Sequence, residues 1–168
     1  MLFRSGDTSL MLAELIQTVS IHSKTTPKKL YIYDSFEGLP EKTINDESVL
    51  GKEFVPGELA VTKREVKDRF LRAGLKVPVI KKGWFREFTS DDLPEKIAFS
   101  FLDGDFYESI RDGLRLIEEK IVSGGILIVH DYNNPALPGV KKAVDEWLGL
   151  LSEKVSLHTF ESMASLKF

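Results

Sequence analysis

Short hydrophobic runs alternate along the chain with longer segments of helical periodicity. Strands are predicted at residues 30–34, 77–81, 97–103 and 124–131. The last of these is a nearly continuous apolar run, which is typical of a parallel sheet covered on both faces. Helices are predicted at residues 61–73, 108–122 and 140–151, where apolar side chains recur every three or four positions.

The order of these elements predicts an α/β fold. Strands that alternate with helices form right-handed βαβ units around a mostly parallel sheet. The last segments, VSLHTF and ASLKF, predict a C-terminal antiparallel hairpin. A length of 168 residues suits a single domain over residues 1–168.

Composition narrows the classes of function. The net charge of −3 offers no excess of positive charge for nucleic acid. The chain has no cysteine, which excludes disulfides, zinc–thiolate sites and cysteine nucleophiles. No apolar run approaches the roughly 20 residues that span a bilayer, so we expect a cytoplasmic protein without a membrane partner.

Polar residues stand where the predicted strands end. In open parallel sheets, ligands bind beyond the carboxyl ends of the strands. The residues in question are Asp34, Gly83 with Trp84, Asp103 with Asp105, and His130 with Asp131. Asp34 fits an acid that accepts hydrogen bonds from ribose hydroxyls, although an Asp that begins a turn is the simpler and commoner explanation.

Two successive acidic strand ends predict a cation site. Asp103 and Asp105 follow one strand, and His130 and Asp131 follow the next. Adjacent strands lie about 4.8 Å apart, so Asp103 and Asp131 are expected to face one ion. Carboxylate oxygens suit a hard cation such as Mg²⁺. Helix N-capping is the structural alternative for these acids, and Glu108 fits it well.

Two further signals are weaker. The segment RSGDTS, which includes Ser5 and Gly6, opens a helix, where backbone N–H groups attract an anionic or carboxylate group. The aromatic side chains of Phe36 and Trp84 have the shape to stack on an adenine. Aromatic residues in loops more often serve packing.

Four segments together resemble one family. They are YDSFEGLPE, KKGWF, FLDGDFYES and GGILIVHDYNNPALPGVKKAV, in the order and near the spacing found in metal-dependent O-methyltransferases. That family includes macrocin O-methyltransferase and the aminocoumarin sugar methyltransferases. The resemblance implies a Rossmann-like class I methyltransferase fold, a three-layer sandwich. It also implies S-adenosylmethionine as cofactor, a divalent metal such as Mg²⁺, and a small-molecule hydroxyl, often on a sugar, as acceptor.

The resemblance also assigns roles to residues. Asp105 is placed as general base, with His130 as a second candidate. Cofactor contacts fall on Ser5, Gly6, Asp34, Ser35, Phe36, Gly83 and Trp84, and metal ligands on Asp103 and Asp131, with His130 added as a third ligand from its own position in the sequence. His130 departs from the family, which commonly has an acid there, and it is interpreted as a ligand, a base or a packing residue. The family's first strand belongs before Phe3, so we expect either that this strand is short or missing or that the sequence starts after it.

Two other functions fit parts of the pattern. An acid-x-acid motif after an apolar strand also holds the metal and diphosphate in nucleotide-sugar transferases. A non-catalytic methyltransferase-fold relic or interaction domain agrees with a missing first strand. If exposed strand edges pair between copies, a homo-oligomer is expected.

Overall fold

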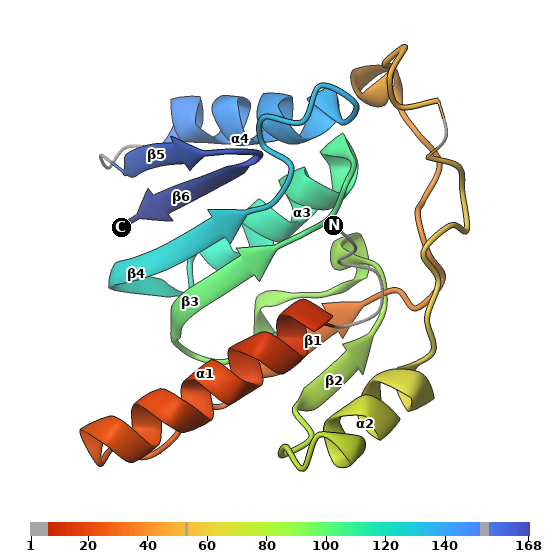
Figure 1. The fold of residues 1–168 in the computed structure, drawn as a ribbon. Coiled ribbons are helices and arrows are strands. Elements are labelled where there is room, and N and C mark those ends of the chain that lie inside the picture. Colours follow the sequence, from red (N-terminus) through yellow and green to blue (C-terminus); the bar gives the residue numbers. More distant parts are fainter. Residues whose placement is uncertain (1–6, 53, 152–154) are drawn as a thin grey trace. The chain divides into compact units, whose positions relative to one another are not determined.

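Two strand–helix–strand segments form the framework of the computed structural model, which describes residues 7–52, 54–151 and 155–168 (Figure 1). The contacts divide the chain into two units. The first comprises Met1–Gly38 and Gly57–Gly83, and the second Leu39–Pro56 and Trp84–Phe168. A single domain over residues 1–168 stays a prediction. The short or missing first strand falls on residues 1–6, outside the described residues.

A parallel strand pair forms the sheet of the first unit. The elements are α1 (Asp7–Ser23), β1 (Tyr31–Asp34), α2 (Lys63–Arg72) and β2 (Val79–Lys82). β1 and β2 run in register from Tyr31 opposite Val79 to Asp34 opposite Lys82. The sequence therefore predicted this βαβ unit correctly, and both strands end at the same edge.

An N-terminal capping box and a buried apolar face explain why residues 63–72 form helix α2. The Thr62 hydroxyl accepts the Glu65 N–H, and the Glu65 carboxylate accepts the Thr62 N–H, which closes a capping box. Val66 and Phe70, one turn apart, are buried in the core of the unit. Leu71, which is also apolar and would be expected to share that face, is 65% exposed. Successive helical residues are about 100° apart, so the residue after Phe70 turns away from the core.

A four-stranded mixed sheet forms the second unit. Its elements are η1 (Ile44–Asp46), η2 (Phe85–Glu87), η3 (Ser90–Asp92), β3 (Ile97–Leu102), α3 (Tyr107–Glu118), β4 (Ile121–Val129), α4 (Pro138–Leu150), β5 (Ser156–Phe160) and β6 (Met163–Lys167). The strand order is β3-β4-β6-β5. β3 and β4 are parallel, whereas β6 is antiparallel to both β4 and β5. The predicted C-terminal hairpin is confirmed.

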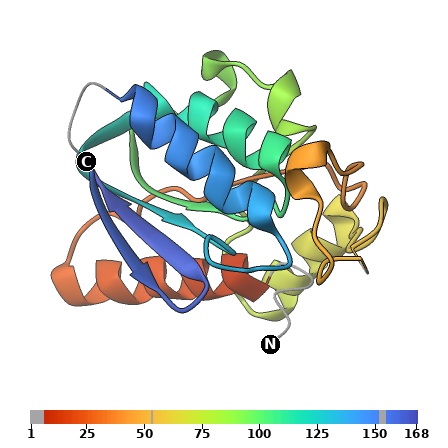
Figure 2. The same ribbon diagram turned by 90° about the horizontal axis from the view of Figure 1, so that it is seen from above.

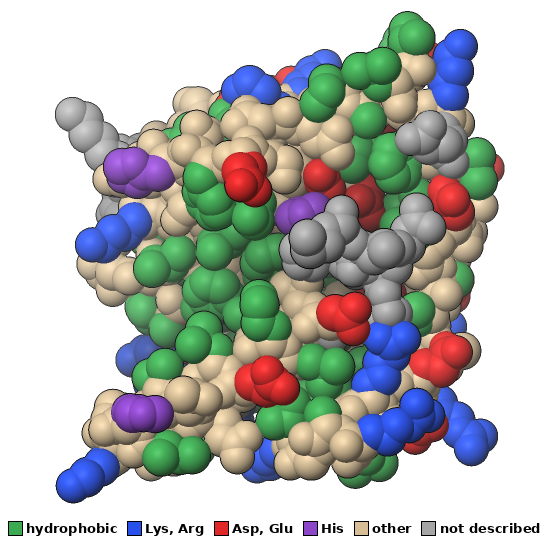
Figure 3. Space-filling view, viewed as in Figure 1, with side chains coloured by type: hydrophobic (Ala, Val, Ile, Leu, Met, Phe, Trp, Pro, Cys, Tyr) green, Lys and Arg blue, Asp and Glu red, His purple; other side chains and the backbone are tan. Residues whose placement is uncertain are grey.

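The core of the second unit lies between its sheet and the helices α3 and α4, which run side by side over one sheet face (Figure 2). The buried side chains include Leu102, Ile110, Leu114, Ile117, Leu127, Val129, Val140, Val144, Trp147, Ala164 and Leu166. On the other sheet face, Phe99 is 43% and Ile126 38% exposed, and hydrophobic side chains gather over β3 and β4 (Figure 3). Among the described residues, no helix combines the length and hydrophobicity needed to cross a membrane.

The boundary between α3 and β4 differs from the prediction. The helical pattern was expected to continue to residue 122, but α3 ends at Glu118 and β4 begins at Ile121. The Ile97 N–H donates to the Lys120 carbonyl over 2.8 Å, and Ile121 pairs with Ile97 across the parallel ladder. Pairing with β3 therefore prevails over the helical periodicity, in agreement with the β-branched side chains of Ile121 and Val122.

Candidate metal and cofactor site

The ends of β3 and β4 lie at one edge of the second unit's sheet. Leu102 pairs with Val129 in the parallel ladder, and the His130 N–H donates to the Leu102 carbonyl over 3.0 Å. Asp103 therefore leaves β3 at the level where His130 and Asp131 leave β4. This proximity, expected from the strand order alone, is confirmed.

Three side chains converge at this edge. His130 Nδ1 lies 2.7 Å from Asp131 Oδ2 and 3.3 Å from Asp103 Oδ1. One ligand atom from each residue lies within 4.8 Å of the other two, as a shared metal ion requires. Two carboxylates and an imidazole form an established donor set for a divalent ion. The residues therefore fit a metal.

Electrostatics favour a positive charge at this position. Hydrogen bonds to Asp103 and Asp131 raise the pKa of His130 to about 10, against the opposing effect of burial. Burial alone would raise the pKa of Asp131, but hydrogen bonds from His130 and Asn134 outweigh it and lower that pKa. The imidazolium thus neutralises the two carboxylates that a cation would otherwise neutralise.

Backbone turns after both strands direct these side chains. Asp105 and Asp131 each have a φ of 57°, in the left-handed region that Asp tolerates better than most residues. The Asn134 N–H donates to the Asp131 carbonyl over 3.1 Å. Asn134 Nδ2 donates to Asp131 Oδ1 over 2.9 Å. The loop therefore holds both the backbone and the carboxylate of Asp131.

The predicted cofactor residues of the first unit gather at the ends of β1 and β2. The Gly83 N–H donates to the Asp34 carbonyl over 2.9 Å. Asp34 Oδ1 accepts the Phe36 N–H over 2.6 Å, and Ser35 Oγ accepts the Glu37 N–H over 3.1 Å. Asp34 thus begins a turn, as the simpler interpretation expected. One of its carboxylate oxygens already has a backbone partner.

The two predicted aromatic residues have structural partners. Phe36, with a φ of 55°, packs against the Val66 and Phe70 core of the first unit. Trp84 belongs to the second unit, where the guanidinium of Arg86 lies 5.6 Å from the centre of its ring. Their roles beside an adenine stay predictions. Ser5 and Gly6 lie outside the described residues.

Asp46 is an important residue that the sequence analysis missed. Its side chain is buried, with 1% exposed. Oδ1 accepts the N–H of Tyr107, the first residue of α3, over 2.6 Å. Oδ2 accepts the N–H and the hydroxyl of Thr43 over 2.9 and 2.8 Å. A carboxylate suits the positive end of a helix dipole, so Asp46 fixes the segment before it to α3. The pattern Thr-x-x-Asp, a capping box, was the available signal.

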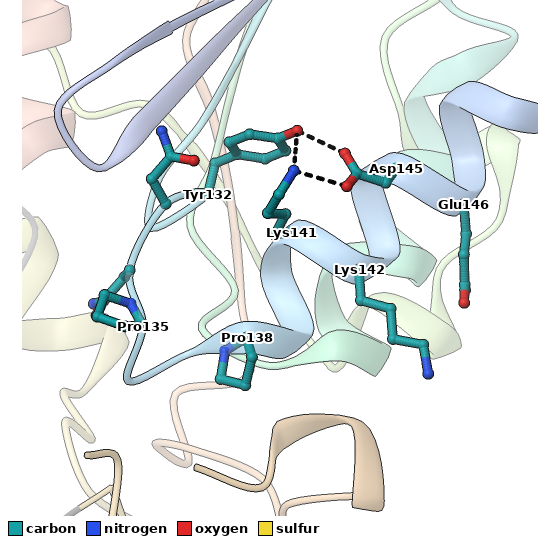
Figure 4. A pocket seen from close by; sticks show the side chains of 9 residues that line it. Tyr132, Pro135, Pro138, Lys141, Lys142, Asp145 and Glu146 are labelled. Carbon is teal, nitrogen blue, oxygen red and sulfur yellow. Dashed lines mark hydrogen bonds and ion pairs between the residues drawn. The ribbon is translucent and has the colours of Figure 1, made fainter. Parts of the chain in front are cut away.

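A polar network borders the loop after Asp131 (Figure 4). The Tyr132 hydroxyl donates to Asp145 Oδ1 over 2.6 Å and accepts from Lys141 Nζ over 2.8 Å. Lys141 Nζ also donates to Asp145 Oδ2 over 2.8 Å. These residues line an open hollow together with Asn133, Asn134, Pro135, Pro138, Lys142 and Glu146. The network ties the residue after Asp131 to helix α4.

Sequence comparison identifies relatives among O-methyltransferases. A Streptomyces olivaceus protein named 8-demethyl-8-(2,3-dimethoxy-alpha-L-rhamnosyl)-tetracenomycin-C 4'-O-methyltransferase is 31% identical over 74% of this chain and 48% of its own length. The demethyldecarbamoylnovobiocin O-methyltransferase of Streptomyces niveus is 27% identical over 84% of this chain and 54% of its own. The chain thus spans about half the length of the curated relatives it matches.

Solved structures support the fold. The O-methyltransferase NovP has a TM-score of 0.73 and 26% identity, covering 91% of this chain and 65% of its own. The calicheamicin methyltransferase CalS11, at 22% identity, also has a TM-score of 0.73, over 94% of this chain and 67% of its own, and supports the fold alone. The predicted Rossmann-like class I methyltransferase fold is confirmed. Residues 2–157 match the macrocin-O-methyltransferase (TylF) family, and the chain belongs to it.

Proposed function

We propose that this protein is an S-adenosylmethionine-dependent O-methyltransferase that acts on a small-molecule hydroxyl with the help of a divalent cation. Asp103, His130 and Asp131 hold the cation. The observation that carries the proposal is that the ligand atoms of these three residues lie within 4.8 Å of one another, at the ends of two adjacent strands. The chain belongs to a family of O-methyltransferases, which gives this geometry its functional meaning.

The relatives support a sugar hydroxyl as the acceptor. One is named for a 4'-O-methylation in a compound that carries a rhamnosyl group. Another, from Micromonospora griseorubida, is a mycinamicin III 3''-O-methyltransferase, 28% identical over 71% of this chain and 49% of its own length. Both names describe methylation of oxygen. We therefore place the acceptor of this protein among sugar-bearing small molecules.

The proposed chemistry needs a proton acceptor beside the cation. An alcohol is a weak nucleophile, and a bound divalent cation lowers the pKa of its hydroxyl and orients it. Asp105, on the turn after β3, accepts the hydroxyl proton as general base. The oxygen then bonds to the methyl carbon while the carbon–sulfur bond breaks, which gives a methyl ether and S-adenosylhomocysteine. His130 serves as a ligand, since its Nδ1 contacts both carboxylates.

All of the proposed cofactor contacts except Trp84 belong to the first unit. We assign the carboxylate of Asp34 to the ribose hydroxyls. The Gly83 N–H already donates to the Asp34 carbonyl, so Gly83 contributes space rather than a donor. In this proposal, Ser35, Phe36 and Trp84 contact the adenosine. Ser5 and Gly6 keep the role that the family resemblance gives them, at the amino-acid end of the cofactor.

Ligand binding and turnover test the proposal with the full chain. Millimolar S-adenosylmethionine should raise the melting temperature, because a ligand that binds only the folded state stabilises it. Asp105→Asn should abolish methyl transfer to a sugar-bearing acceptor and leave this shift intact. No shift with or without divalent metal would contradict the proposal. If the protein instead binds a nucleoside diphosphate tightly in the presence of Mn²⁺ and does not bind S-adenosylmethionine, the result would favour the alternative function of a nucleotide-sugar transferase. Cofactor binding without turnover would favour the relic.

A further inference from the structure

The imidazole of His130 stands among the oxygen ligands of the proposed cation site. Its Nδ1 lies 2.7 Å from Asp131 Oδ2 and 3.3 Å from Asp103 Oδ1. Neighbouring ligands of an octahedral ion with bonds of about 2.1 Å lie about 3 Å apart. The nitrogen therefore occupies a ligand position, and an ion bound by the two carboxylates would meet it.

Donor chemistry then distinguishes between metals. Mg²⁺ prefers oxygen ligands, whereas imidazole nitrogen suits first-row transition ions. We propose that His130 is the metal-specificity residue of this protein and makes the site prefer a transition ion such as Mn²⁺, Co²⁺ or Zn²⁺ over Mg²⁺. This inference rests on the proposed function for the position of the ion.

The ring of His130 is fixed before any ion arrives. The backbone N–H donates to the Leu102 carbonyl over 3.0 Å, which places the residue on the β3–β4 ladder. The side chain is 13% exposed. Its ring lies 6.1 Å from the ring of Phe101, centre to centre. A ligand held in place loses little conformational entropy on coordination, so the nitrogen contributes fully to metal selection.

Nuclear magnetic resonance of the imidazole groups tests direct ligation in the wild-type chain. The sequence holds three histidines, so His22 and His158 are internal controls. Addition of Zn²⁺ to chelator-treated protein should shift the His130 ring signals and leave those of His22 and His158 in place. Zn²⁺ binding that leaves the His130 signals unmoved would overturn the inference, and this measurement needs no variant.

A substitution tests selectivity. Calorimetric titrations of the wild type with Mg²⁺ and with Mn²⁺ give the dissociation constant of each ion. The constant for Mg²⁺ divided by that for Mn²⁺ should be well above one. In His130→Asp, with three carboxylates, that ratio should fall by at least about tenfold, because Mg²⁺ gains an oxygen ligand. His158→Asn is the matched control, and its ratio should equal that of the wild type. An unchanged ratio in a folded His130→Asp protein would overturn the inference.

Cofactor binding separates this inference from the proposed function. The melting-temperature shift with S-adenosylmethionine is measured in the presence of chelator, where no metal contributes. If the protein binds the cofactor and transfers methyl groups, but the wild type and His130→Asp have the same metal preference, only the inference about His130 is overturned. A chain that ligates Zn²⁺ through His130 but never binds the cofactor overturns only the methyltransferase.

Discussion

The carboxylate of Asp46 fills the space beside Gly139 at the start of α4: a Cβ atom on Gly139 would lie 2.0 Å from Asp46 Oδ1. The Cβ and backbone N of Tyr107 would lie 2.9 Å away. Gly139→Ala should therefore destabilise the protein by about 2 kcal/mol or more, because a buried site cannot absorb the extra atom without shifting its neighbours. Urea denaturation monitored by circular dichroism measures this loss.

Gly149, in the same helix, is the matched control. A Cβ there meets no atom within 4 Å. Gly149→Ala should stabilise the protein by about 0.5–1 kcal/mol, since Ala has the higher helix propensity. If both alanine variants lose similar stability, the close approach of Asp46 to Gly139 is not the cause.

Removal of the Asp46 carboxylate should also be costly. Asp46→Ala leaves the N–H groups of Tyr107 and Thr43 without this acceptor and removes a negative charge from the start of α3. We expect a loss of about 2–4 kcal/mol in unfolding free energy. Asp46→Asn keeps one acceptor oxygen and should lose less. The double variant with Gly139→Ala should lose less unfolding free energy than the sum of the losses of the two single variants, because the two residues share one space.

The proximity of Asp103 and Asp131 could be predicted from sequence because few factors determine it. Parallel neighbouring strands end at the same edge of a sheet. Asp103 and Asp131, which follow β3 and β4, were therefore expected to lie close together once the two strands were identified. The role of Asp46 could not be predicted in the same way. Asp46 and Tyr107 are 61 positions apart in the sequence. A local pattern of apolar residues cannot predict which distant helix start a buried acid will contact.

Element boundaries show a second limit of the sequence. Ile121 continues the apolar spacing of α3 and was placed on that helix. Its pairing with Ile97 decides the conformation, and this tertiary contact is invisible to a local pattern. Phe36 is a further case: an aromatic residue in a loop fits ligand stacking and packing alike, and only the structure shows its contact with the core.

The Tyr132 network gives a pH-dependent prediction. Burial, then the hydrogen bond to Asp145, raises the pKa of Tyr132 above its ordinary 10.0, while Lys141 opposes this. A raised pKa means that the neutral phenol stabilises the folded state below pH 10.0 and that this contribution is lost as pH rises through the folded-state pKa. The difference in unfolding free energy between wild type and Tyr132→Phe should therefore be about 1 kcal/mol near neutral pH and shrink above pH 10.0. Urea titrations of both proteins at several pH values measure it. A difference independent of pH would exclude this role of the phenol.

Asn134 is predicted to position the proposed metal ligand Asp131 without touching the ion. Its Nδ2 donates to Asp131 Oδ1 over 2.9 Å, and its Oδ1 accepts the Ala136 N–H over 3.0 Å. Groups that orient a metal ligand commonly contribute ten- to a hundredfold in affinity, so Asn134→Ala should weaken Mn²⁺ binding by at least about tenfold. Calorimetry at one pH, with melting temperatures recorded alongside, separates this effect from general destabilisation.

The neighbouring Asn133 provides the comparison for that experiment. Its Nδ2 donates to the Glu161 carbonyl over 3.3 Å, a contact with the turn between β5 and β6 that does not involve Asp131. Asn133→Ala should keep the wild-type affinity for Mn²⁺ even if the melting temperature falls, because no ligand of the site loses a partner. Equal weakening in both variants would assign the effect to the loop as a whole. Weakening in Asn134→Ala alone would support the orientation of Asp131 as its cause.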